Sequence, residues 1–241
     1  MTAGGVRAIA TDVDGTLLRS DGTISPRTEA ALAAAEDAGL LVVLCTGRPP
    51  DSMHDITHRG IAVCGNGTVV HDLHTDTTIK AFGLDLAAAD EIGQELLAAM
   101  PDLELAHEVV ADVVTRLTVK HPTMPARELE RAVHTALPSL AERAATSHWP
   151  EGRLMEIFSH GLSKATALEH VLADHGIAAA QVVAFGDYDN DLPLLSWAGH
   201  AVAMGNATPE VKAIADEVTL TNDEDGLAVV VERLLREISG C

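Results

Sequence analysis

The stretch Ile9–Leu18, IATDVDGTLL, decides the fold of this chain. The apolar run Val6–Thr11, which leads into it, has the composition of a buried parallel strand. Two aspartates, Asp12 and Asp14, follow at a spacing of two residues, and Gly15 comes next. Ligands of an open parallel sheet bind beyond the carboxyl ends of its strands. The stretch therefore suits a pair of catalytic carboxylates, although Asp and Gly also meet in ordinary turns.

The same arrangement, an apolar strand that ends in a polar loop, recurs along the chain. Later runs of this kind are Leu40–Cys45 before Thr46-Gly47, Ile61–Cys64 before Asn66, and Val182–Phe185 before the Gly186–Asp191 loop. Helical segments alternate with the strands, which predicts a Rossmann-like α/β fold with a three-layer parallel-sheet core. Right-handed crossovers would bring the polar loops to one edge of that sheet. Leu17–Ile24 is expected to form a small hairpin, and Asp51–Arg59 a short helix.

Between residues 83 and 160 the pattern changes to helix-strand-strand, repeated once. This order predicts an inserted α+β domain, αββαββ, between two parts of the core at 1–82 and 161–241. Gly83 and Gly161 lie at the two crossings. They suit a pair of hinge strands, and they equally suit plain loops.

The composition of the chain, above all its net charge, limits the kinds of molecule that it could bind. The 241 residues include 36 acidic and 16 basic side chains, a formal net charge of −20, which repels nucleic acid and anionic membranes. No apolar run approaches the ~18 residues that would span a bilayer. Three cysteines are too few for a disulfide framework, so we expect a reducing, cytoplasmic location. The sequence leaves the oligomeric state open between monomer and dimer.

The polar residues at the strand ends indicate the type of reaction that the site could catalyse. Four carboxylates, Asp12, Asp14, Asp187 and Asp191, would meet at one edge, and Lys164 begins a helix that leads to the last two. Carboxylates crowded in this way raise one another's pKa unless a cation lies among them. Oxygen ligands suit a hard ion such as Mg²⁺, and a nearby lysine would hold a phosphate. The residues thus predict metal-assisted phosphoryl transfer to an aspartate.

The motifs Asp12-x-Asp14-Gly-Thr, Thr46-Gly-Arg, Lys164 and Gly186-Asp187-x-x-Asn190-Asp191 resemble the four motifs of the haloacid dehalogenase (HAD) superfamily, in the same order. The insert resembles the C2B cap of the Cof-like, type IIB hydrolases. Together the motifs cover the chain from end to end, and their joint match is far more specific than any single one.

The resemblance implies a role for each matching residue. Asp12 would be the nucleophile, and Asp14 the general acid and base. Mg²⁺ would be held by the carboxylates of Asp12 and Asp187 and by the backbone carbonyl of Asp14. The phosphate would be bound by Thr46, Gly47, Lys164 and Asn190. Asp191 would orient Lys164, and Asn66 is a candidate for contact with the substrate or simply part of an Asn-Gly turn.

We therefore expect a Mg²⁺-dependent phosphatase that acts on small phosphorylated metabolites, such as sugar phosphates, through an aspartyl phosphate. A phosphosugar mutase shares these motifs and is the nearest alternative. A sensor that binds a phosphorylated ligand without turnover is the alternative from another class, and intact Asp12 and Asp14 count against it.

Other residues carry weaker signals. His54 and His58 have the i, i+4 spacing of a helical metal pair, but no third ligand is evident from the sequence. We expect His71 and His74 to be solvated and Arg48 to have a surface or packing role. Five residues of the insert lie on predicted strands that could face a substrate, although each also suits packing: Arg116, His148, Trp149, Met155 and Glu156.

Overall fold

A computed structural model describes residues 5–57, 59–148 and 152–240. Within these residues the chain divides into two compact units, Met1–Ile79 with Ser163–Cys241, and Lys80–Leu162. The junctions thus fall within three residues of those expected, which were 82/83 and 160/161. No described helix has the length and apolar composition needed to cross a membrane.

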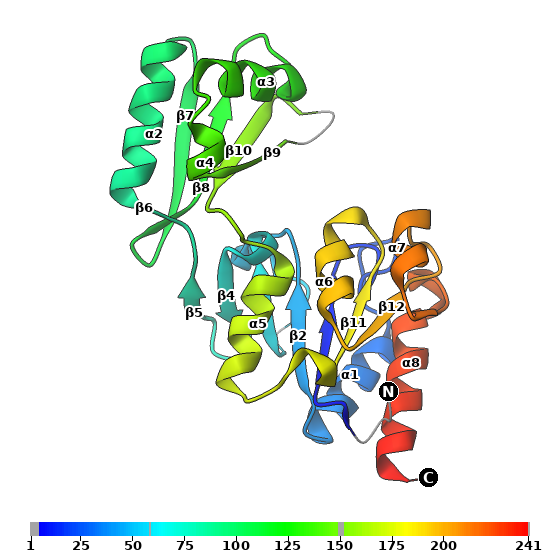
Figure 1. Ribbon diagram of the computed structural model, residues 1–241. Coiled ribbons are helices and arrows are strands. Elements are labelled where there is room, and N and C mark those ends of the chain that lie inside the picture. Colours follow the sequence, from blue (N-terminus) through cyan, green and yellow to red (C-terminus); the bar gives the residue numbers. More distant parts are fainter. Residues whose placement is uncertain (1–4, 58, 149–151, 241) are drawn as a thin grey trace. The chain divides into compact units, whose positions relative to one another are not determined.

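The first unit is built on a sheet that has eight strands among the described residues (Figure 1). Its spatial order is β13 (Glu217–Val218), β12 (His200–Ala203), β11 (Val182–Gly186), β1 (Ala8–Thr11), β2 (Leu41–Cys45), β3 (Ile61–Cys64), β4 (Val69–Asp72) and β5 (Thr77–Ala81). From β13 to β3 every pairing is parallel. The α/β class expected from the sequence is confirmed.

Helices cover both faces of this sheet, as its apolar strands require. On one face lie α5 (Lys164–Asp174) and α6 (Leu192–Trp197), with α7 (Pro209–Ile214) beside α6 (Figure 1). The other face carries α1 (Pro26–Asp37), which packs against α8 (Gly226–Ser239). The strand β1 is buried at every position, and so is β11 beside it. The centre of the sheet therefore forms the core, and its loops start from a rigid base.

The inserted unit follows the predicted αββαββ order. Its elements are β6 (Leu84–Asp85), α2 (Leu86–Ala99), β7 (Glu104–Val110), β8 (Val113–Lys120), α3 (Ala126–Ala136), the short α4 (Leu140–Arg143), β9 (Ala145–His148) and β10 (Leu154–Phe158). Its core is apolar and includes Ile92, Leu117 and Leu129. A Cβ atom at Gly83 would lie 2.2 Å from the carbonyl oxygen of Val114, so close packing alone explains that glycine.

Two local expectations were wrong, and one strand was not foreseen. In place of the helix expected over Asp51–Arg59, the described residues there form a 3₁₀ turn, Pro50–Ser52, and further turns, with Met53 as their one fully buried apolar side chain. Leu17–Ile24 closes through turns, with Arg19 N–H donating to Thr23 O at 2.9 Å, and forms no strand ladder beyond a bridge at Leu18. The strand β4 was missed, since it holds only two adjacent apolar residues before His71.

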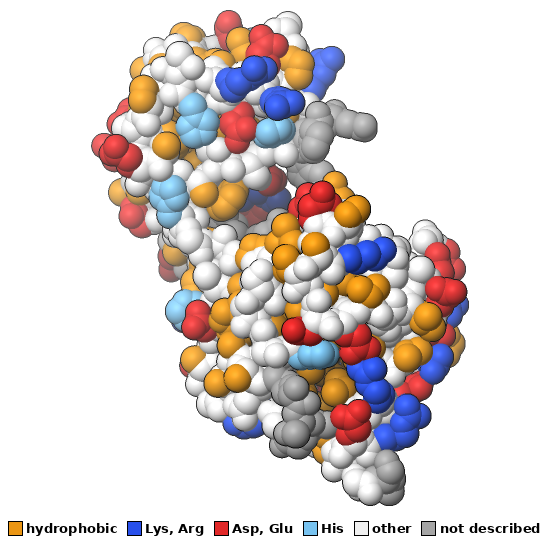
Figure 2. All heavy atoms as spheres, turned by 45° about the vertical axis from the view of Figure 1, so that its right-hand side comes forward, with side chains coloured by type: hydrophobic (Ala, Val, Ile, Leu, Met, Phe, Trp, Pro, Cys, Tyr) orange, Lys and Arg blue, Asp and Glu red, His pale blue; other side chains and the backbone are white. Residues whose placement is uncertain are grey.

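Charge is dispersed on the visible surface. On the face drawn in Figure 2, acidic side chains lie over both units, with Lys and Arg among them in small groups. No extended basic patch is visible among the described residues of that face.

Candidate active site

The first group of site residues lies at the carboxyl end of β1. Asp12 follows that strand directly, and its N–H donates to Phe185 O of β11 at 3.0 Å. This bond fixes the backbone of Asp12 to the centre of the sheet. The Asp12 side chain is only 8% exposed, which is uncommon for a carboxylate without a charged partner.

That partner is Lys164, at the start of α5. Ser163 caps this helix, and its side chain accepts from Thr166 N–H. The ammonium of Lys164 lies 2.5 Å from Asp12 Oδ1 and 2.7 Å from Asp191 Oδ1, with the side chain 1% exposed. Burial by itself would lower the pKa of Lys164, but the two carboxylates outweigh it and the pKa is raised. Lys164 is therefore a fixed positive charge between two aspartates.

The loop after β11 supplies two more carboxylates. Asp191 Oδ2 accepts from the N–H groups of Asp187 and Tyr188, at 3.0 and 3.2 Å. Both of its oxygens are thus engaged, one by Lys164 and one by backbone. Asp187 Oδ1 accepts from the Thr16 hydroxyl at 3.0 Å. Asp191 has the bonding of a positioning residue, whereas the hydrogen bond from Thr16 engages one oxygen of Asp187.

Gly15 is required beside Asp187. Its φ is +83°, a left-handed conformation that favours glycine, and a Cβ there would lie 2.4 Å from Asp187 Oδ2. The Gly15 carbonyl accepts from Asn206 Nδ2 at 2.8 Å. Sequence reasoning gave no role to Asn206 or Thr16 in this support. Asn206 could have been suspected from the sequence, because it is a polar residue in the loop that follows another strand, β12.

Negative charge accumulates between these loops. Ligand oxygens of Asp12, Asp187 and Asp191 all lie within 4.8 Å of one another. Burial raises the pKa of Asp12 to about 7, and the carboxylates of Asp191 and Asp187 add to the increase against the opposing effect of Lys164. Burial likewise raises the pKa of Asp187 to about 6. Three carboxylates face one ammonium, an arrangement that suits an additional cation held by oxygen ligands.

Asp14 points to a different partner. Arg48 Nε donates to Asp14 Oδ2 at 2.8 Å, and Arg48 Nη2 donates to Oδ1 at 2.5 Å. Such a two-bond fork fixes the orientation of a carboxylate more firmly than a single contact. The sequence favoured a surface or packing role for Arg48 over catalysis. The structure pairs its partly exposed side chain with Asp14, across the loops that follow β2 and β1.

The remaining phosphate-binding candidates lie in the loops after β2, β3 and β11. Thr46 is buried, and its hydroxyl accepts from Arg48 N–H at 3.0 Å. A Cβ at Gly47 would lie 3.3 Å from the amide end of Asn66. Asn66 has φ +56°, and its Oδ1 lies 3.5 Å from Asn190 Nδ2. Thr46, Gly47, Asn66 and Asn190 therefore lie in neighbouring loops of the first unit.

Other candidates from the sequence are placed differently. His71 is buried, 7% exposed at its side chain, so the expectation that it is solvated was wrong. His74 is exposed in its side chain and contacts Gly60 N–H. Met155 is fully buried in the core of the inserted unit and cannot face a substrate. His58 and Trp149 lie outside the described residues.

Comparisons with known proteins agree with this geometry. The model of the haloacid dehalogenase-like hydrolases matches residues 9–109 and 104–231. The 5-amino-6-(5-phospho-D-ribitylamino)uracil phosphatase YitU of Bacillus subtilis is 30% identical over 95% of this chain and 96% of its own. The pyridoxal phosphate phosphatase YbhA of Escherichia coli is 30% identical over 92% and 96%. A HAD-superfamily phosphatase from Bacteroides thetaiotaomicron superposes with a TM-score of 0.77, at 23% identity over 95% of each chain.

The chain belongs to the haloacid dehalogenase-like hydrolases. It is a Cof-like member of that family, and the αββαββ order of its insert is the one that the resemblance to the C2B cap implied. It is a phosphoric monoester hydrolase of that family.

Proposed function

We propose that this phosphatase depends on Mg²⁺ and hydrolyses small phosphomonoesters through an aspartyl phosphate on Asp12. The observation that carries the proposal is the bridge from Lys164 to Asp12 and Asp191, beside the carboxylate of Asp187. A buried nucleophile held at one oxygen by an ammonium leaves its other oxygen to attack phosphorus. The phosphate group would be drawn in by the same fixed positive charge.

The donor set fits Mg²⁺. Asp12 and Asp187 offer carboxylate oxygens, and the backbone carbonyl of Asp14 is proposed as a further ligand. Asp191 is less suited to the ion, since Lys164 and two backbone N–H groups already occupy its oxygens. When bound, Mg²⁺ would neutralise charge on the carboxylates and on the transferring phosphoryl group.

The residues of the chain divide the reaction between them. Asp12 Oδ2 attacks phosphorus while Lys164 holds Oδ1, and the bond from phosphorus to the leaving oxygen breaks. Asp14 gives that oxygen a proton and then takes one from the water that attacks the aspartyl phosphate. Inorganic phosphate leaves and Asp12 is regenerated. Thr46, Gly47 and Asn190 are proposed to hold the phosphate oxygens throughout.

The inserted unit is proposed to select the organic part of the substrate. It carries a pocket of about 440 Å³ lined by Glu104, Leu105, Ala106, Arg116, Thr118, Lys120, Leu154 and Glu156. Arg116 is already paired with Glu108 and Glu156, which neutralises its guanidinium. Lys120 and Glu104 add one charge of each sign, so the lining is polar and its charges balance, which favours an uncharged polar group over a second anion.

The test is phosphate release from a panel of sugar phosphates, nucleotides, pyridoxal phosphate and phosphoglycolate, with Mg²⁺ and after chelation. We expect release that needs Mg²⁺ and is fastest with a polyol or sugar phosphate. An isomerised hexose phosphate in place of free phosphate would instead indicate the mutase. No release from any compound would favour the sensor. The cytoplasmic location remains a prediction.

A further inference from the structure

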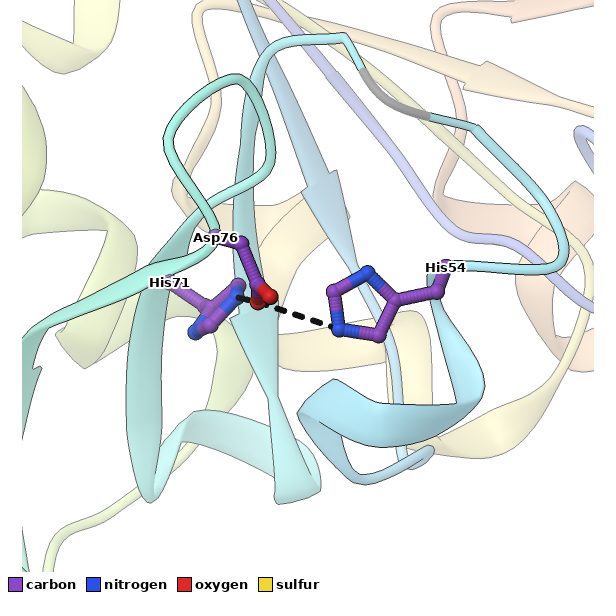
Figure 3. Close-up of side chains that lie close together, drawn as sticks. All are labelled: His54, His71 and Asp76. Carbon is purple, nitrogen blue, oxygen red and sulfur yellow. Dashed lines mark hydrogen bonds and ion pairs between the residues drawn. The ribbon is translucent and has the colours of Figure 1, made fainter.

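A second cluster of ligand-type side chains lies in the first unit, on segments that the proposed reaction does not use. It consists of His54, His71 and Asp76 (Figure 3). His54 lies in the turns after Pro50–Ser52, His71 lies on β4, and Asp76 lies in the turn between β4 and β5. The two partners lie 17 and 22 residues after His54 along the chain, whereas His58, considered from the sequence, lies outside the described residues.

The three side chains converge on one point. Asp76 Oδ1 lies 3.1 Å from His54 Nε2 and 3.1 Å from His71 Nε2. All three ligand atoms lie within 4.8 Å of one another, and the two rings meet edge to face at 85°. Ligand bonds of about 2.0–2.1 Å in a tetrahedron place neighbouring ligand atoms roughly 3.3 Å apart. The separations from Asp76 are therefore already close to those of a metal site.

The surroundings support ligand roles for these atoms. The second ring nitrogen of His71, Nδ1, faces the hydroxyl of Thr78 at 3.5 Å. Metal-binding histidines commonly direct their other ring nitrogen to an oxygen, which fixes the ring orientation. The His71 side chain is 7% exposed, whereas those of His54 and Asp76 are 33% and 68% exposed. An ion would thus rest on a buried ligand and keep an open side for water.

We propose that His54, His71 and Asp76 form a site for a divalent transition metal, with Zn²⁺ as the probe. Two imidazoles and one carboxylate suit Zn²⁺, whereas Mg²⁺ prefers oxygen ligands alone. The site is separate from the carboxylates at the end of β1. A bound ion would link His54, in the turns that follow Arg48, to His71 and Asp76 of the β4–β5 hairpin.

The experiment measures Zn²⁺ affinity of the full chain by competition with a chromophoric chelator. Excess Mg²⁺ is present throughout, and an Asp12→Asn/Asp187→Asn variant removes carboxylates that could also bind zinc. We expect one Zn²⁺ per chain, retained in that variant. His54→Gln and Asp76→Asn each weaken binding at least tenfold, while His107→Gln, at an exposed histidine of β7, leaves it unchanged.

His71→Gln alters a buried position, so circular dichroism must first show that this variant folds. His54→Gln and Asp76→Asn alter partly exposed side chains and do not depend on that result. X-ray absorption at the zinc edge should show two nitrogen ligands at about 2.0–2.1 Å. Unchanged affinity in both exposed variants, binding lost with Asp12 and Asp187, or no bound zinc would each overturn the proposal.

Discussion

Arg48 and Asp14, 34 residues apart, are joined by two hydrogen bonds between a guanidinium and a carboxylate. If Asp14 is the acid and base of the reaction, Arg48 acts through it as a positioning residue. Both carboxylate oxygens accept from Arg48, and each keeps a second lone pair that can carry the proton exchanged with the leaving oxygen.

We expect Arg48→Met to lower kcat/KM by roughly tenfold, since Asp14 then samples other orientations. The decisive measurement is a double-mutant cycle with Asp14→Asn. In the Asp14→Asn background, the Arg48 change should have almost no further effect. Arg59→Met is the matched control, because Arg59 pairs with Glu36 instead. Losses that simply multiply in the double variant would show that Arg48 acts independently of Asp14.

Lys164 is expected to be as important for stability as for turnover. Lys164→Met leaves the buried carboxylates of Asp12 and Asp191 without their shared cation. Breaking a buried pair in this way typically costs about 3–5 kcal/mol of the free energy of unfolding. Urea denaturation in Mg²⁺-free buffer measures the loss, and Lys80→Gln, at an exposed lysine, is the control.

A second substitution separates charge from packing in that variant. Adding Asp191→Asn to Lys164→Met removes one unpaired carboxylate and should restore part of the lost stability. If the double variant were less stable than the wild type by the full sum of the two single losses, the loss would stem from packing rather than from charge.

Because the pKa of Asp187 is raised in the fold, the contribution of this residue to the free energy of unfolding depends on pH. In the fold this pKa is about 6, against 3.8 for an ordinary aspartate side chain, so the folded state holds the proton more tightly. The favourable contribution is complete below pH 3.8 and is lost as the pH rises through about 6. Without metal, Asp187→Asn should therefore stabilise the protein at pH 8 and much less at pH 4. Because solvent screens this partly exposed carboxylate, we expect a gain of roughly 1 kcal/mol at pH 8.

Thermal unfolding of the chelator-treated protein at both pH values measures this difference. Asp102→Asn, in an exposed turn after α2, serves as the control. A substitution that destabilises equally at pH 4 and pH 8 would argue that Asp187 contributes through its hydrogen bond with Thr16 and not through crowded charge.

The pocket of the inserted unit predicts a change in selectivity. Glu156→Gln removes one of the two carboxylates that neutralise Arg116. The guanidinium is then more available to a second anion, so the KM for phosphoglycolate should fall relative to the KM for a sugar phosphate, by a few fold. Glu142→Gln, at an exposed position on α4, is the control. Equal changes in both KM values would show that this pocket does not select between the two substrates.

Much of this architecture could be predicted from sequence because the core strands are short apolar runs that each end in a polar loop. Parallel strands with right-handed crossovers bring such loops together, so Asp12 and Lys164 could be placed near each other without coordinates. Hydrophobic periodicity does not specify partners for polar side chains outside the strands. His71 was misjudged for that reason, since its partner Asp76 lies in the turn between β4 and β5, and the pairing of Arg48 with Asp14 was not foreseen.

Chemical trapping of Asp12 tests the central claim most directly. Rapid acid quenching of the Mg²⁺-loaded enzyme during turnover, followed by borohydride reduction and peptide mass analysis, locates an acyl phosphate on the chain. We expect homoserine at position 12, and none in Asp12→Asn, which should also lose at least about a thousandfold in kcat. Steady release of phosphate with an unmodified Asp12 at every quench time, or with the modification at another aspartate, would contradict the proposed mechanism.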